Sequence, residues 1–273
     1  MTSLPPSQAS GGAIGFAPAS ADSHGVATIT LSNPGKLNAI DIAMWGALRS
    51  HFEQMQAMPE EVAPSAVILC GADGNFAAGG DIAEFAGFRF DESKLREFHE
   101  QVVGPALAAI AACDIPLFAQ IEGACIGAGL EIAACCDIRI CGSSSRFGAP
   151  IGKLGFPMAP GEMMLLGAIA APAVMREMLL EARLLDAQTA LHRGLVHEVV
   201  GDTDVYSTTI ERARRLADLS SQAARINKRT LRQIARGGPD PAERMAHYNY
   251  ADSAEHREGV TAFLNKRRPR FAR

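Results

Sequence analysis

The sequence has little of what marks nucleic-acid-binding, disulfide-stabilised or membrane proteins. Its 26 Lys and Arg are outnumbered by 30 Asp and Glu, so the net charge of -4 creates no overall positive field for a polyanion. Only six cysteines occur and none forms a C-x-x-C pair, which predicts reduced, mostly buried thiols. No apolar run reaches the roughly 18 residues of a membrane span, and the N-terminal segment lacks a secretory signal. We therefore expect a soluble cytoplasmic protein that binds neither nucleic acid nor membranes.

Motifs for several common chemistries are also missing. The turn containing Gly127 and Gly129 has Ile132 where a dinucleotide-binding fingerprint requires a small residue. Neither the phosphate-binding G-x-x-x-x-G-K-[ST] nor the serine-hydrolase G-x-S-x-G pattern occurs. His192 and His197 have the wrong spacing to align as metal ligands on one helical face. The sequence therefore predicts no metal ion and no redox cofactor.

Strand and helix patterns alternate through the middle of the chain. Short runs rich in β-branched residues predict strands, and most are followed by a helical pattern of apolar residues. Because the runs are almost continuously apolar, we expect an α/β domain whose strands are buried on both faces. Predicted strands cover residues 25–31, 65–71, 116–123 and 138–142, and predicted helices cover 41–58, 95–112, 128–136 and 161–185.

The two ends of the chain differ from this middle part. Residues 1–23 are rich in Ser, Pro, Ala and Gly without periodicity, which predicts a flexible tail. Residues 206–273 are mainly helical in pattern, with a break near Gly237, so the α/β core should cover residues 24–205. A basic stripe at spacings of three and four marks one face of this helical region, and we expect that face to be solvated. The stripe consists of Arg225, Arg229, Arg232 and Arg236.

Two glycine-rich turns follow predicted strands and carry the main functional signal. The first contains Gly79 and Gly80, and the second opens into a helix at Ala128. Free N–H groups at such turns and helix starts suit a developing negative charge. One amide from each turn can form an oxyanion hole beside the carboxyl of Glu131, which favours acyl chemistry through an enolate. The alternative is structural: the glycines allow tight packing, Glu131 stabilises the helix start, and Cys125 is an inert buried thiol.

The order and spacing of these segments resemble the enoyl-CoA hydratase/isomerase (crotonase) superfamily from about Gly25 to Phe271. The resemblance implies a spiral core of repeated strand-strand-helix units with a helical C-terminal region. It also implies an acyl-CoA substrate, with coenzyme A entering as part of that substrate, and assembly as homotrimers or hexamers. The motifs that carry it are NPGKLNAI (33–40), FAAGGDIAEF (76–85), the turn 122–131, CDIRI (136–140), GLVHEVV (194–200) and FLNKRRPRF (263–271).

The resemblance implies roles for individual residues as well. Gly80 and Ala128 match the two oxyanion N–H donors, and Glu131 matches the first of two catalytic glutamates, the one that helps to activate water. Ile151 stands where the family carries its second glutamate, which handles the proton at the α-carbon. Contacts with coenzyme A are implied for Lys36, Ala39, Ala78, Asp81 and Ile82, and for Phe263 and Lys266 of this or a neighbouring subunit. Asp81 and Asp137 are expected, in addition, to hold turns.

These residues lead to one hypothesis and three alternatives. The hypothesis is an enoyl-CoA hydratase-like enzyme that holds the thioester oxygen with Gly80 and Ala128 and uses Glu131 as acid and base. Isoleucine cannot transfer a proton, so Ile151 leaves double-bond isomerisation and decarboxylation through the same enolate open. A non-catalytic acyl-CoA-binding protein is the alternative outside enzyme chemistry.

Overall fold

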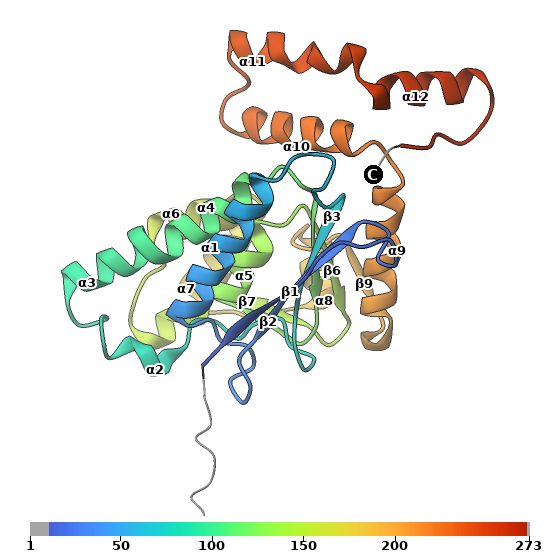
Figure 1. The fold of residues 1–273 in the computed structure, drawn as a ribbon. Helices are drawn as coiled ribbons and strands as arrows, with labels where there is room; N and C mark the ends of the chain where they lie inside the picture. The colour runs from blue at the N-terminus through green and yellow to red at the C-terminus, as the bar shows by residue number, and fades with distance from the viewer. Residues whose placement is uncertain (1–10, 272–273) are drawn as a thin grey trace, which may run out of the picture.

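Two β-sheets form the framework of the protein, and the computed structural model describes residues 11–271 (Figure 1). The larger sheet has the order β1-β2-β3-β4-β6-β9, with β1 antiparallel to β2 and the other neighbours parallel. The smaller sheet has the order β5-β7-β8. The strands are β1 Ala13–Ala17, β2 Val26–Ser32, β3 Ala66–Gly71, β4 Leu117–Ile121, β5 Ala124–Ile126, β6 Ile138–Gly142, β7 Arg146–Gly148, β8 Leu185–Asp186 and β9 Glu198–Val200.

Both faces of the larger sheet are buried, as the nearly continuous apolar strands predict. Along β3, Val67 and Leu69 belong to the main core, whereas Ala66 and Ile68 belong to a second apolar cluster on the opposite face. Helix α9 (Val205–Ala217) covers that second face. Side chains alternate between the two faces of a strand, so a strand with apolar residues on both sides requires cover on both sides.

Helices cover the main-core face of the larger sheet (Figure 1). Helix α1 (Ile42–Gln56) begins at Asp41, whose side chain accepts a hydrogen bond from the Met44 N–H at 2.8 Å. Its buried face packs against α4 (Gly104–Ala112). Helix α5 (Ala128–Ala134), buried at nearly every position, joins the two sheets and packs against α6 (Pro160–Gly167). The short helix α8 is Ala187–His192.

The prediction of a flexible tail over residues 1–23 is wrong for the segment that forms β1. Ala13–Ala17 pairs with β2 in antiparallel register, and the ring of Phe16 stacks on His51 of α1 at 5.2 Å. Ile14 and Phe16 point toward the core, and small residues alternate with them. This period of two is typical of a strand, but over five residues it is too short to stand out in a segment rich in Ala and Gly. The tail prediction for residues 1–10 lies outside the described residues.

Two predicted helices are interrupted in the structure. The pattern over 161–185 divides into α6 and α7 (Pro172–Leu180), because Pro172 lacks an N–H and begins a new helix. The pattern over 95–112 contains a π-helical turn, η1 (Phe98–Val103), between α3 (Glu92–Glu97) and α4. Such turns are frequent at functional sites, because the extra residue redirects the neighbouring side chains.

The C-terminal region is helical, as predicted, and its helices lie together at one end of the molecule (Figure 1). They are α10 (Ser221–Ala235), α11 (Pro241–Ala246) and α12 (Ala254–Leu264).

The prediction that the basic stripe is solvated is wrong for Arg225 and holds only in part for the others: Arg232 is half-buried, whereas Arg229 and Arg236 are exposed. Arg225 is buried and donates to the Pro64 carbonyl oxygen at 3.1 Å, and Arg229 and Arg232 both bind Asp114. The neighbouring Lys228 is buried too, with hydrogen bonds of 2.7 Å to the Ile115 carbonyl and to Asp137. The stripe faces the chain segments that enter β3 and β4, whose carbonyl oxygens need donors, so it docks α10 to the core.

Asp114 is expected to anchor the C-terminal helices. Burial alone would raise the pKa of its carboxyl, but hydrogen bonds from Arg229 and Arg232 lower the pKa below its usual value. Asp114→Ala removes a carboxylate that accepts charge-assisted hydrogen bonds, and should lower the free energy of unfolding by about 2 to 3 kcal/mol. Urea unfolding measures this change. The control is Asp252→Ala, which breaks an exposed pair with Arg257 and should cost about 1 kcal/mol or less. Equal losses in the two variants would contradict the anchoring role.

The cysteines behave as the sequence predicts. All six are free, and all but Cys70 are buried. Burial raises the pKa of the Cys125 thiol far above its usual value, so this residue is an inert thiol rather than a nucleophile. No helix within residues 11–271 is both long and apolar enough to cross a membrane.

Candidate active site

The two glycine-rich turns lie against each other beside the smaller sheet. Parallel bridges join Ile40 to Gly80 and Ala77 to Cys125, so both turns extend from neighbouring strand-like segments. A side chain at Gly127 would place its Cβ 3.6 Å from the Cα of Gly79, which shows how closely the backbones approach. Gly79 has φ +115 and Gly127 has φ +50, backbone conformations that glycine adopts without strain.

This conformation leaves one backbone donor free in each turn. Among residues 11–271, no backbone or side-chain acceptor bonds the N–H of Gly80 or of Ala128. Ala128 is the first residue of α5, so its N–H lies at the positive end of that helix dipole. Both residues line one cavity. An oxygen atom that gains negative charge in this cavity can accept hydrogen bonds from both turns.

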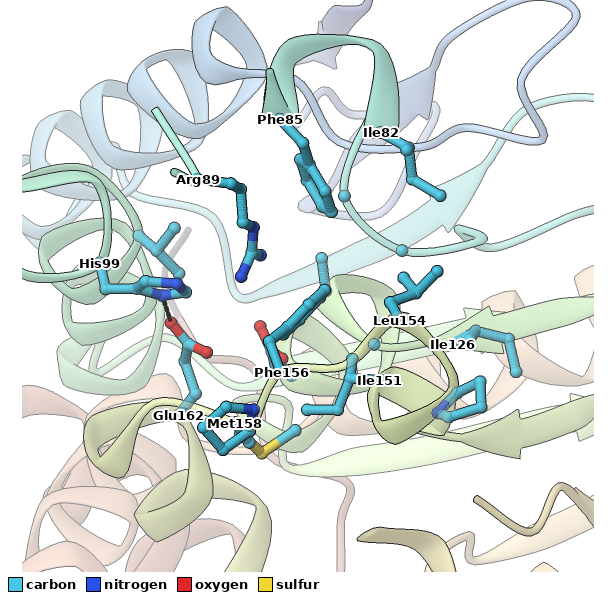
Figure 2. A pocket seen from close by; sticks show the side chains of 18 of the residues that line it. Ile82, Phe85, Arg89, His99, Ile126, Ile151, Leu154, Phe156, Met158 and Glu162 are labelled. Atoms are coloured by element: carbon cyan, nitrogen blue, oxygen red, sulfur yellow. Dashed lines mark hydrogen bonds and ion pairs between the residues drawn. The ribbon is translucent and has the colours of Figure 1, made fainter. Parts of the chain in front are cut away.

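The cavity has a volume of about 300 Å³ and an apolar wall (Figure 2). Its polar groups come from segments far apart in the sequence: Arg89 follows α2 (Ile82–Phe85), His99 lies in η1, Glu131 in α5, Lys153 in the 3-10 helix after β7, and Glu162 in α6. The labelled apolar side chains around them are Ile82, Phe85, Ile126, Ile151, Leu154, Phe156 and Met158.

Glu131 is a buried carboxyl that has no hydrogen-bond donor among the described residues. Its exposed fraction is 7%, and it lies one helical turn after the free N–H of Ala128. Burial raises the pKa of Glu131 well above its usual value, the charge of Glu162 raises it further, and Arg89 opposes the change. Glu131 therefore keeps its proton to higher pH than an exposed carboxyl does, and the protonated form can deliver that proton inside the cavity.

Glu162 and His99 form a second polar centre that the sequence analysis did not find. Glu162 is 6% exposed, and its Oε1 is hydrogen-bonded to Nδ1 of His99 at 2.5 Å (Figure 2). The available signal was a single glutamate at the start of an apolar helix, which is also the ordinary place for a stabilising acid. Nothing in the local sequence connects it with a histidine in a different helix.

Arg89 brings a positive charge into the cavity. Its guanidinium lies between the rings of Phe85 and Phe156, 4.2 and 3.8 Å from their centroids. Figure 2 shows it pointing into the cavity, and its buried Nε has no hydrogen-bond partner among the described residues. Burial lowers the pKa of Arg89, while Glu162 and Glu131 oppose that shift. A cation so close to two carboxyl groups reduces the repulsion between them.

The residues expected to contact coenzyme A divide into two groups. Ala78 and Ile82 line the cavity. Lys36 instead pairs with Asp81 at 2.6 Å, and this hydrogen bond raises the pKa of Lys36. Asp81 also caps α2 by accepting a hydrogen bond from the Ala83 N–H, so its expected role in holding a turn is confirmed. Ala39 is buried beside this turn, outside the cavity wall.

Of the remaining predicted residues, one lies in the cavity wall and the others lie outside it. Ile151 lines the cavity from the 3-10 helix Pro150–Leu154. Phe263 of α12 is 84% exposed, and Lys266 follows that helix. Figure 1 shows α12 at the opposite end of the molecule from α2 and α3, so this chain does not bring Phe263 or Lys266 to its own cavity. Asp137 accepts hydrogen bonds from the Leu117 N–H and from Lys228, which confirms its structural role.

Comparison with known proteins identifies the family of this chain. The sequence matches the enoyl-CoA hydratase/isomerase family over residues 21–273. The 2,3-dehydroadipyl-CoA hydratase of Escherichia coli is 30% identical over 250 residues, covering 90% of this chain and 94% of the relative.

Solved structures match over similar lengths. An enoyl-CoA hydratase/carnithine racemase from Magnetospirillum magneticum superposes with a TM-score of 0.86 and 36% identity, covering 90% of this chain and 92% of its own. An enoyl-CoA hydratase from Bacillus anthracis gives a TM-score of 0.80 at 26% identity, with coverage of 90% and 95%.

The two sheets and the C-terminal helices match solved structures of this family, so the protein has the α/β crotonase fold. This chain belongs to the enoyl-CoA hydratase/isomerase (crotonase) family. The resemblance stated from the sequence motifs is thereby confirmed.

Proposed function

We propose that this protein is an enoyl-CoA hydratase-like enzyme that acts on an acyl-CoA thioester through an enolate. The observation that carries the proposal is the pair of free N–H groups at Gly80 and Ala128, which line one cavity with the buried carboxyl of Glu131. The thioester oxygen accepts both hydrogen bonds, which stabilise the negative charge that forms as water adds to the double bond. Each such donor typically contributes about a hundredfold or more to the rate. Glu131 transfers a proton to or from the acyl chain.

Recognition of coenzyme A is proposed for the rim of the same cavity. Ala78 and Ile82 line it, and Lys36 and Ala39 belong to the adjoining turn that Asp81 holds. Phe263 and Lys266 contribute from a neighbouring subunit of a homotrimer or a hexamer, since their own chain keeps them away from its cavity. The exposed apolar side chains of α12, Val260, Phe263 and Leu264, are suited to such an interface.

Ile151 is the observation that favours a second candidate activity. Its side chain cannot transfer a proton, so a reaction that needs fewer acids fits the same oxyanion donors. Double-bond isomerisation and decarboxylation of an acyl-CoA are such reactions. An acyl-CoA-binding protein without turnover is the candidate outside enzyme chemistry. Glu131 argues against it, because a buried carboxyl with a raised pKa and no hydrogen-bond donor among the described residues is typical of a catalytic site.

Incubation of the purified protein with crotonyl-CoA in deuterated water tests the proposal. Mass spectrometry then separates addition of water from exchange of carbon-bound hydrogen. We expect a hydrated product that carries deuterium at the α-carbon. Deuterium uptake without addition of water would support isomerisation instead. A thioester recovered unchanged, together with tight binding in a calorimetric titration, would support the binding protein and contradict the hydratase.

A further inference from the structure

Hydration of an enoyl thioester requires two proton transfers. Water must lose a proton when its oxygen attacks the β-carbon, and the α-carbon must gain one. Glu131 can serve one of these transfers, and Ile151 can serve neither. The cavity therefore needs another acid-base group if it hydrates its substrate.

Glu162 has the position and the burial that such a group requires. It lines the same cavity as Gly80, Ala128 and Glu131, from helix α6, which packs against α5. Its carboxyl is held by Nδ1 of His99 at 2.5 Å, and His99 itself lines the cavity from the π-helical turn (Figure 2). A carboxyl that is buried and oriented by a second titratable side chain is a typical arrangement for a catalytic base.

The surroundings of the two carboxyls differ in a way that divides their roles. Nδ1 of His99 is within hydrogen-bond distance of the Glu162 carboxyl and fixes its orientation, whereas Glu131 has no donor among the described residues. The negative charge of Glu162 raises the pKa of Glu131, and burial raises it more. A buried carboxyl without a donor suits the acid of such a pair, and a carboxyl oriented by a histidine suits the base.

We propose that Glu162, oriented by His99, is the second catalytic acid-base residue of this site. It accepts the proton of the attacking water, and Glu131 donates its proton to the α-carbon. This inference rests on the proposed hydratase function. The family resemblance implies that Glu131 helps to activate water, whereas here Glu131 protonates the α-carbon and Glu162 activates water.

The proposed step balances as follows. An O–H bond of water breaks, and its proton goes to the carboxylate of Glu162. The water oxygen bonds to the β-carbon, while the π electrons of the double bond shift to the thioester oxygen, which Gly80 and Ala128 stabilise. The resulting enolate takes the proton of Glu131 at its α-carbon, which forms the 3-hydroxyacyl thioester. A proton then passes from Glu162 to Glu131 and restores the starting state.

Glu162→Gln tests the assignment, because two reactions of one variant report the two carboxyls separately. Hydration of crotonyl-CoA should fall at least about thirtyfold in kcat. Exchange of the α-hydrogen of butyryl-CoA in deuterated water needs the oxyanion donors and the ionised form of Glu131 as base, but no attacking water. Loss of the Glu162 charge lowers the pKa of Glu131, so exchange should be retained or rise. Retained exchange also shows that the variant is folded. Glu100→Gln is the matched control: this exposed residue adjoins His99 and lies outside the cavity wall, so both rates should stay at the wild-type level.

Several results would overturn the assignment. Unchanged hydration in Glu162→Gln would do so, and so would a raised KM with unchanged kcat, since Glu162 would then only bind the acyl group. Equal losses of hydration and exchange would show that Glu162 supports the structure of the cavity and does not take part in proton transfer. Wild-type protein that exchanges butyryl-CoA without hydrating crotonyl-CoA would contradict this inference but retain enolate chemistry. Absence of both wild-type reactions would instead contradict the proposed function itself.

Discussion

Replacing Glu131 by Gln is expected to reduce turnover of the acyl-CoA substrate at least about a hundredfold, with thioester affinity nearly unchanged. The amide has almost the same volume as the carboxyl but cannot transfer a proton. No hydrogen bond within residues 11–271 is lost, because the Glu131 carboxyl has no donor there. Steady-state kinetics measure turnover, and calorimetric titration with a saturated acyl-CoA measures affinity. Turnover at the wild-type level would remove Glu131 from the mechanism.

The stability of the same variant against pH is an internal control. The raised pKa of Glu131 means that the folded protein binds this proton more tightly than the unfolded chain does. The resulting stabilisation is fully present below the ordinary carboxyl pKa of about 4 and is lost as pH rises toward the folded-state pKa. Glutamine does not titrate. Wild-type protein should therefore lose stability relative to Glu131→Gln as pH rises, and parallel stability curves would show that Glu131 is not the buried neutral acid described above.

Removing the backbone donor at Ala128 is expected to have a comparable effect. Ala128→Pro deletes this N–H at the first position of α5, where proline fits a helix without breaking an intrahelical hydrogen bond. Loss of one oxyanion donor should lower kcat by about a hundred- to a thousandfold. The measurement is kcat for the acyl-CoA substrate, with the thermal midpoint recorded beside it.

Ala128→Gly is the matched control for this change. Glycine also alters the side chain but keeps the N–H, so its kcat should remain within about fivefold of wild type. Equal losses in the proline and glycine variants would mean that the side chain of Ala128, rather than its backbone donor, matters. An unaffected proline variant would leave the oxyanion role to Gly80 alone.

Local patterns were sufficient for most of the fold. The strands β2, β3, β4 and β6 are apolar runs between turns, and the helices α1 and α5 follow such runs with a suitable period. Strand β1 was missed because it is short and lies on the sheet edge, where only every second residue contacts the core. Helices α6 and α7 were merged because both are apolar, although Pro172 between them marks a helix start.

For the charged residues of α10, the sequence predicts their position on the helix but not the surroundings of that face. Their spacing correctly places Arg225, Arg229 and Arg232 on one face of a helix. Spacing cannot tell whether that face meets water or the carbonyl oxygens and the carboxylate of another segment. The partner Asp114 lies more than a hundred residues earlier in the chain. Only the docking of α10 on the core decides between these outcomes.

The sequence by itself determined the crotonase family, the two glycine-rich turns and the helix that begins between Gly127 and Glu131, because these features depend on residues adjacent in the chain. The tertiary structure alone decided that Glu162, His99 and Arg89 share a cavity with Glu131. Their helices meet through packing of apolar faces, which many residue combinations can satisfy, so no local pattern specifies which polar side chains come together. The burial that raises the pKa of Glu131 has the same origin, since desolvation depends on every segment that covers a group.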